Sequence, residues 1–396
     1  MELRDLVNDR PAHLVLLVVD GLGGYADARH GSELEEATTP NLDQLAAEGS
    51  CGVALPAGPG ITVGSGPGHL ALFGYDPLEY DLGRGLLSAL GLGVDLRPGD
   101  LAARGNLATL DADDNVVDRR AGRIDDARAR AIVDRLEAGV SLPDVEVSFR
   151  HVSEHRVLLV LRGEGLDPRV GDLDPQRTGV PPLAPTATAP EAERTARLLE
   201  QLDAAMREAL VGQDADVVLF RGFDTHHDLP SMQERFGLRP ATVATYPMYR
   251  GVAKLVGMDL LPVVDSLGEQ IALMADRWND YDYLFAHEKA ADSAGHDGRR
   301  DAKIAAIEAV DALVPDLVAL APDVLCITAD HAAPTQLSSH SWHPVPTLLW
   351  GEAVGRDAVT SFGERACAAG MLGHLRTQDL LPLMLASARR LEKYGA

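Results

Sequence analysis

The chain has 396 residues, of which 46% are hydrophobic, so it can form about two or three domain-sized units with sizeable cores. Its 60 acidic and 36 basic residues give a formal net charge of -24, which argues against nucleic acid and anionic membrane surfaces as partners. The three cysteines have no paired C-x-x-C spacing, and the N-terminal residues have neither a secretory nor a transit character. We therefore expect a cytoplasmic protein without a disulfide framework or a thiolate zinc site.

The first predicted element is a buried strand over residues 14–19 (LVLLVV), which ends in Asp20 and a glycine-rich loop. A helix follows, with Thr39 as a candidate cap and Pro40 in its first turn. Similar apolar runs return later in the chain, and these are residues 241–246, 281–286, 324–328 and 347–350. This alternation predicts an α/β fold with a mostly parallel sheet covered by helices.

The middle of the chain has a different sequence pattern, with short predicted strands and a proline-rich loop over residues 180–190. The strands are expected at residues 107–110, 116–117, 145–149 and 157–161, and one strong helix at residues 191–210. We therefore predict an inserted, smaller α+β domain at 97–225. It would interrupt a catalytic domain made of residues 1–96 and 226–396.

Polar side chains follow two of the predicted strands directly. Asp20 ends the first strand, and Asp330 with His331 ends the strand at residues 324–328. Ligands gather at the carboxyl ends of strands in open parallel sheets. A carboxylate paired with an imidazole is also a metal-ligand signal.

A second source of ligands lies near the C-terminal part of the chain. Asp292 and His296 are spaced i, i+4, so they converge if the segment is a helix, and a tight loop would also allow this. His340 precedes a strand-like run, and His343 competes with it as a ligand. Three carboxylates and three imidazoles suffice for two adjacent divalent ions, and they come from Asp20, Asp292, His296, Asp330, His331 and His340.

Ser65 is the candidate nucleophile. It lies between Gly64 and Gly66, ahead of a predicted helix. Flanking glycines let the backbone approach an anion, and a helix N-terminus offers free N–H groups to phosphate. Metal coordination would activate the serine hydroxyl in the absence of an obvious general base.

Seven segments of the chain resemble the archaeal-type branch of the cofactor-independent phosphoglycerate mutases, in the alkaline phosphatase superfamily. The segments are DGLGG, ATTPNLDQLAAEG, GSGPGHLALFGYDP, LGRGLLSALG, HEKAADSAGHDG, TADHAAP and HSWHPVP. They occur in the family's order together with RGNLATL, RRAGR and LDP in the middle region. The resemblance covers nearly the whole chain and implies an alkaline-phosphatase-like sheet with an inserted domain.

The resemblance also implies roles for particular residues. Ser65 is similar to the family's phosphorylated serine. The ligands that share the second metal with Ser65 would be Asp20, Asp330 and His331, and those of the first metal Asp292, His296 and His340. The family follows that last histidine with Ser-Gly-Asp or Thr-Gly-Asp, whereas this chain has Ser341-Trp342-His343, so His340 and His343 both stay candidates.

Substrate recognition is implied for further polar residues. The matching positions are His151, Arg156, Asp174 and Arg221 in the inserted domain and Lys289 in the catalytic domain, with Arg119, Arg120 and Arg123 as further candidates. Arginine and lysine would supply the local positive charge that an anionic substrate needs.

The implied reaction interconverts 3-phosphoglycerate and 2-phosphoglycerate through a phosphoserine at two divalent metal ions. Mn²⁺ is the first expectation, and Zn²⁺, Co²⁺ and Mg²⁺ also suit oxygen and imidazole ligands. A metal-dependent phosphatase or a homoserine-kinase-like phosphoryl transferase on the same core is the alternative. A non-catalytic, metal-stabilised binding protein is a third interpretation, and it would not need Ser65. The sequence does not indicate an oligomeric state.

Overall fold

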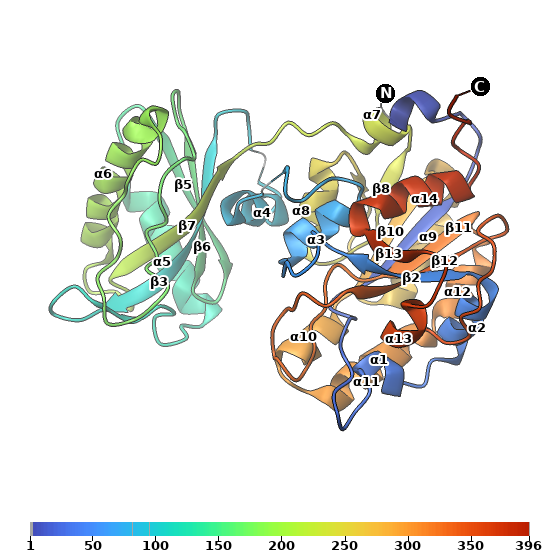
Figure 1. Cartoon of the computed structure of the whole chain (residues 1–396). Helices are drawn as coiled ribbons and strands as arrows, with labels where there is room; N and C mark the ends of the chain where they lie inside the picture. Colours follow the sequence, from blue (N-terminus) through green and yellow to red (C-terminus); the bar gives the residue numbers. More distant parts are fainter. Residues whose placement is uncertain (1–2, 81, 95, 396) are drawn as a thin grey trace. The chain divides into compact units, whose positions relative to one another are not determined.

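A computed structural model describes residues 3–80, 82–94 and 96–395 of the chain. The chain forms two compact units, Met1–Asp81 with Leu229–Ala396, and Leu82–Asp228 (Figure 1). The second unit begins before residue 97, where we expected the insertion to start, because helix α4 (Arg84–Gly91) packs against the strands of that unit. Among the helices of the described residues, none has the length and apolar character that a membrane span requires.

Unit 1 is built on an eight-stranded sheet with the order β13-β2-β12-β11-β1-β10-β8-β9. The strands are β1 (Leu14–Val19), β2 (Ser50–Leu55), β8 (Pro240–Thr242), β9 (Asp259–Leu260), β10 (Tyr283–Glu288), β11 (Val324–Thr328), β12 (Val345–Trp350) and β13 (Gly373–Arg376). Neighbouring strands from β11 to β9 are parallel, whereas β12 runs antiparallel to β11 and β2. The predicted α/β fold with a mostly parallel sheet is therefore confirmed.

Helices flank this sheet (Figure 1). They are α1 (Glu33–Glu36), α2 (Pro40–Glu48), α3 (Ser65–Leu72), α7 (Met232–Phe236), α8 (Pro247–Leu255), α9 (Leu267–Asp276), α10 (Ala290–His296), α11 (Arg300–Asp311), α12 (Val314–Ala319), α13 (Glu364–Cys367) and α14 (Leu380–Ser387). Every residue of β1 and of β11 is buried, as expected for central strands of a parallel sheet. The predicted strand at 241–246 is shorter than expected, because only Pro240–Thr242 form β8.

Unit 2 contains an antiparallel sheet of five strands, in which β3 pairs with β4, β6 and β7, and β6 pairs with β5. The strands are β3 (Leu101–Leu110), β4 (Val116–Asp118), β5 (Glu146–Ser153), β6 (Arg156–Arg162) and β7 (Val217–Thr225). The predicted helix at 191–210 appears as a short 3-10 turn, Pro190–Ala192, followed by α6 (Glu193–Leu210). Helix α5 (Asp126–Gly139) and strand β7 were not predicted.

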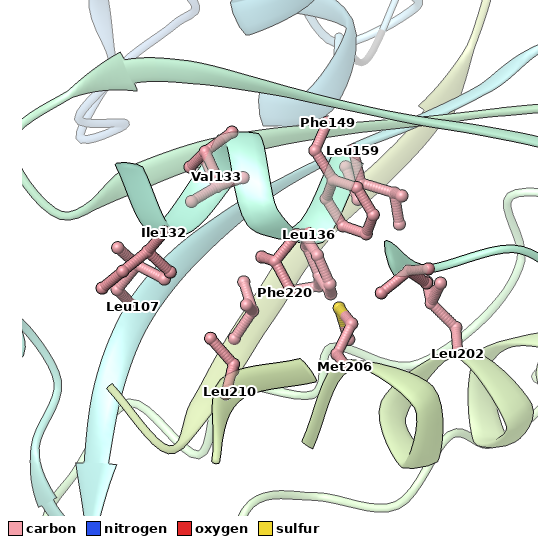
Figure 2. Close-up of a cluster of buried hydrophobic side chains, with 14 of the residues drawn as sticks. Leu107, Ile132, Val133, Leu136, Phe149, Leu159, Leu202, Met206, Leu210 and Phe220 are labelled. Carbon is pink, nitrogen blue, oxygen red and sulfur yellow. The ribbon is translucent and has the colours of Figure 1, made fainter. Parts of the chain in front are cut away.

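Unit 2 has a hydrophobic core of its own, which Figure 2 shows. Leu136 of α5 and Met206 of α6 are buried together with Phe149 and Phe220 of the sheet. The two helices thus bury one face of the sheet, while α4 contacts β3, β6 and β7. A separate core is the usual mark of a domain that can fold alone.

Candidate active site

The site in unit 1 begins at the carboxyl ends of three neighbouring strands. β1 lies between β10 and β11 in parallel register, with Val19 opposite Glu288 and Val18 opposite Thr328. The residues that follow these strands therefore share one edge of the sheet. Asp20, Asp330 and His331 all lie there and are fully buried.

One cluster of potential ligands consists of Asp292, His296 and His340. The Nε2 atoms of His296 and His340 each lie 3.6 Å from Oδ1 of Asp292. Asp292 and His296 share a helix, α10, so the helical alternative for this segment is the one observed. The other ring nitrogen of His340 lies 2.9 Å from the carbonyl oxygen of Val63, which orients the ring.

His343 lies elsewhere. Its ring stacks on Tyr25 with 4.6 Å between centroids, and its Nδ1 atom lies 2.9 Å from Oγ of Ser341. The ring of His340 instead stacks on His331 at 3.6 Å. Of the two histidines that the sequence left open, the structure therefore brings His340 to the ligand cluster.

A second cluster consists of Asp20, Asp292 and His331, and Asp330 adjoins it. Nε2 of His331 lies 3.4 Å from Oδ1 of Asp20 and 3.2 Å from Oδ2 of Asp330. Within the part of the chain that the structure describes, one buried oxygen on each of Asp20, Asp292 and Asp330 has no hydrogen-bond partner. Unpaired buried carboxylate oxygens are costly, and oxygen together with imidazole nitrogen is a donor set that suits divalent cations. The two clusters therefore fit bound divalent metal.

Ser65 is the first residue of α3, after Gly64 at the helix cap. Its Oγ atom lies 3.0 Å from Nε2 of His331, at the edge of the second cluster. Gly68, one turn further along, packs so closely that a Cβ atom there would lie 2.4 Å from the carbonyl oxygen of Asp330. This contact holds the start of the helix against the loop that carries Asp330. The serine hydroxyl thus lies at a helix N-terminus beside the potential metal ligands.

The carboxylates of the site ionise differently. Burial, and then the negative charge of Asp20, raise the pKa of Asp330 to about 7. Burial alone would also raise the pKa of Asp20, but contacts with His287, His331 and Lys289 bring that pKa well below its ordinary value. Buried carboxylates held together in this way favour a positive charge between them.

Lys289 supplies one such charge. Its Nζ donates to Oδ2 of Asp20 and to Oδ2 of Asp292, each at 2.8 Å, and to the hydroxyl of Tyr249 at 2.9 Å. Burial opposes the charged form, yet Asp20 and Asp292 raise the pKa of Lys289 above its ordinary value. The ammonium thus bridges the two ligand clusters, which the sequence did not indicate.

Three further side chains at the site were not singled out from the sequence. Tyr249 donates its hydroxyl proton to Asp20, and Nε2 of His287 lies 3.3 Å from Oδ2 of Asp20. His69 stacks on Tyr249 at 4.1 Å, and its Nδ1 lies 2.8 Å from the carbonyl oxygen of Ser65. The i, i+4 spacing of Ser65 and His69 was a signal for the histidine. Nothing near Tyr249 marks it apart from other buried aromatics.

In unit 2 the structure brings Asp174 and Arg221 into one neighbourhood. Arg119 donates to both carboxylate oxygens of Asp174, at 2.9 and 2.6 Å, and Arg221 donates to the side chain of Gln176 at 3.2 Å. Burial, and then Arg84, lower the pKa of Arg221, as expected where positive charges gather. Because Asp174 is buried and bonded by Arg119, it holds that arginine in place.

His151 and Arg156 lie at the turn between β5 and β6. Nε2 of His151 lies 2.9 Å from the carbonyl oxygen of Glu154, and Arg156 donates to Ser153 at 3.1 Å and to Glu154 at 3.0 Å. Both side chains are therefore engaged with the turn itself. His155, beside them, has its pKa lowered to about 4 by burial and then by Arg156.

The fold and the site define an α/β enzyme in which carboxylate, imidazole and serine side chains meet at the carboxyl edge of a parallel sheet. A profile of the 2,3-bisphosphoglycerate-independent phosphoglycerate mutases matches residues 46–215. A protein of Thermus thermophilus, named as a probable mutase of this kind, is 48% identical over 100% of this chain and 98% of its own length. A relative with the same name from Aquifex aeolicus is 43% identical over 100% of this chain and 99% of its own.

Two solved structures have the same fold. A Pyrococcus horikoshii protein has a TM-score of 0.83 and 28% identity, over 98% of this chain and 100% of its own. The cofactor-independent phosphoglycerate mutase of Thermoplasma acidophilum has a TM-score of 0.72 and 28% identity, over 95% of this chain and 99% of its own. The chain belongs to the 2,3-bisphosphoglycerate-independent phosphoglycerate mutase family.

Proposed function

We propose that this enzyme interconverts 3-phosphoglycerate and 2-phosphoglycerate by way of a phosphoserine at Ser65. The observation that carries the proposal is the position of the Ser65 hydroxyl, 3.0 Å from His331 and at the N-terminus of α3. Membership of the mutase family supports the choice of substrate.

The two clusters of carboxylates and imidazoles would hold two divalent cations. Asp292, His296 and His340 would bind one cation, and the other would be bound by Asp20, Asp330, His331 and Ser65. Mn²⁺ is the first choice, with Zn²⁺, Co²⁺ and Mg²⁺ as further candidates. When bound, such ions supply Lewis-acid stabilisation of phosphoryl oxygens and lower the pKa of a coordinated hydroxyl.

In the proposed reaction, Ser65 Oγ loses its proton and forms a bond to phosphorus as the bond from phosphorus to the glycerate oxygen breaks. The departing oxygen gains a proton, and the glycerate reorients. Its other hydroxyl then gives up its proton and forms a bond to phosphorus as the bond from phosphorus to Ser65 Oγ breaks, and Ser65 Oγ regains a proton. The free N–H groups at the start of α3 favour the phosphate charge throughout.

Basic side chains are the proposed partners of the substrate's negative charge. Lys289 carries an ammonium next to the ligand clusters and would bind a phosphate or carboxylate oxygen by exchanging one of its three present hydrogen bonds, which go to Asp20, Asp292 and Tyr249. In unit 2, we propose that Arg221, Arg156 and His151 recognise phosphate or carboxylate groups of the substrate, and that Asp174 holds Arg119 for the same purpose. The proposed partner is thus a small phosphorylated carboxylate.

Phosphorus NMR of the Mn²⁺-loaded protein with 3-phosphoglycerate, without added 2,3-bisphosphoglycerate, tests this function. We expect 2-phosphoglycerate to appear with the wild-type protein and to be absent with Ser65→Ala. Ser88→Ala, which changes a serine of α4 outside the site, should keep the activity.

Inorganic phosphate as the main product would make water the acceptor and replace the mutase with a phosphatase. Transfer to another added alcohol such as homoserine would point to a kinase-like transferase. Full mutase activity in Ser65→Ala would remove the phosphoserine route.

A further inference from the structure

Lys303, on α11, is a buried lysine that the proposed function does not use. Its side chain is fully buried. A buried ammonium is costly unless it is paired and hydrogen-bonded. The groups that bind the Lys303 ammonium therefore indicate its role in the structure.

Two of those partners are backbone carbonyls in the loops that carry metal-ligand candidates. Nζ of Lys303 donates to the carbonyl oxygen of Gly23 at 3.1 Å and to that of Ala333 at 2.9 Å. Gly23 follows Asp20 by three residues, and Ala333 follows His331 by two. The ammonium thus connects the loop after β1 to the loop after β11.

The two loops also meet directly, since the backbone N–H of Ala333 donates to the carbonyl oxygen of Gly23 at 3.0 Å. One carbonyl therefore accepts from both the opposite loop and Lys303. A lysine head group has three donors, so it can hold both carbonyls and still face an anion. A neutral side chain of similar length would leave both carbonyls without this donor.

Glu33, the first residue of α1, provides the opposite charge. Its Oε2 atom lies 3.9 Å from Nζ of Lys303, and its Oε1 atom accepts from the backbone N–H of Thr335 at 3.0 Å. Thr335 lies two residues after Ala333, so the loop after β11 is held at both points. Burial lowers the pKa of Lys303, and Glu33 opposes that effect.

We propose that Lys303 is a positioning residue for metal binding. Its ammonium sets the spacing between the loop of Asp20 and the loop of Asp330 and His331, so that the three side chains are already placed for one cation. This inference rests on the proposed metal site and adds a residue that touches neither metal nor substrate.

Calorimetric titration of the full-length, metal-free protein with Mn²⁺ tests the proposal. Lys303→Met alone would leave the buried Glu33 with Arg300, 3.5 Å away, as its remaining cationic neighbour. The main variant is therefore the double one, Glu33→Gln with Lys303→Met, which removes both buried charges. Asp330→Asn identifies the binding event that belongs to the second cluster. In the double variant we expect that event to weaken at least tenfold, with activity lost at limiting Mn²⁺ and regained at excess Mn²⁺.

Lys393→Met, at an exposed lysine, is the matched control and should bind Mn²⁺ as the wild type does. Thermal unfolding of the metal-free variants separates loss of fold from loss of affinity. A folded double variant with wild-type affinity at the second cluster would overturn the positioning role. Wild-type protein that bound no divalent cation would instead overturn the proposed metal site itself.

Discussion

At the scale of single residues, Asp330 shows how far the site depends on a bound cation. Its carboxyl is fully buried next to Asp20, and its pKa is raised to about 7 from an ordinary value of 3.8. A folded-state pKa above the unfolded one stabilises the fold below the ordinary value, and this contribution disappears as the pH rises through the folded pKa. Near neutral pH, a proton and a metal ion therefore compete for this carboxylate.

We predict that the metal-free protein loses thermal stability as the pH rises from about 4 to about 7, the interval between the ordinary and the raised pKa of Asp330, because this carboxyl must then ionise without a cation beside it. Differential scanning calorimetry in the presence of a chelator measures this. Asp330→Asn should flatten the dependence over the same range. An equally steep decline in that variant would show that another group is responsible.

The sequence predicted the site residues that follow apolar strands, since a strand end fixes where its next side chain lies. Asp20, Asp330 and His331 are of this kind. The sequence could not choose between His340 and His343, because both occur in one loop and tertiary contacts separate them. His340 contacts Val63 and Asp292, whereas His343 stacks on Tyr25. Tyr249 could not be found either, because it reaches Asp20 from a separate helix.

At the scale of elements, the contact between α3 and the loop after β11 fixes the position of Ser65. Only a glycine fits at position 68, because a Cβ atom would lie 2.4 Å from the backbone of Asp330. The backbone of Asp330 follows β11 closely, so it cannot move aside as a flexible side chain could. The helix would have to move, and it carries Ser65 in its first turn.

We therefore predict that Gly68→Ala lowers kcat on the order of 100-fold by displacing Ser65, with a smaller loss of stability of about 1–3 kcal/mol from overpacking. Steady-state kinetics and thermal unfolding measure the two effects. Gly139→Ala, in α5, is the control, since a Cβ atom there would meet nothing within 4 Å. Unchanged kcat in a folded Gly68→Ala protein would contradict this account.

Element prediction succeeded where apolar runs were long and failed where charged residues obscured them. β1 and β11 have the predicted bounds. Helix α5 was missed because Arg and Asp surround its few buried residues, although Ile132, Val133 and Leu136 have helical spacing. Strand β7 was missed because its apolar run, residues 217–220, is short and continues into the mixed residues 221–225 (RGFDT).

At the scale of the whole molecule, the proposed metal ligands lie in one folding unit and the other unit has none of them. Every proposed metal ligand belongs to unit 1, whereas unit 2 is one continuous segment with a core of its own. The ends of that segment are joined to each other, since the backbone N–H of Gly83 donates to Asp224 at 2.6 Å. Such a segment needs little from the rest of the chain in order to fold.

We predict that residues 82–228, produced alone, fold cooperatively and do not bind Mn²⁺. Near-ultraviolet circular dichroism with thermal melting tests the first part, and calorimetric titration tests the second. A fragment without fixed tertiary structure would show that unit 2 depends on unit 1.

The bridge that Lys289 makes between Asp20 and Asp292 bears on how the enzyme matures. Buried carboxylates without a cation would repel one another and oppose folding. Because the chain brings its own ammonium to that place, we expect newly made protein to reach its final shape while metal is scarce. Loading then becomes a late step, in which the cation available in the surroundings decides which metal the enzyme holds.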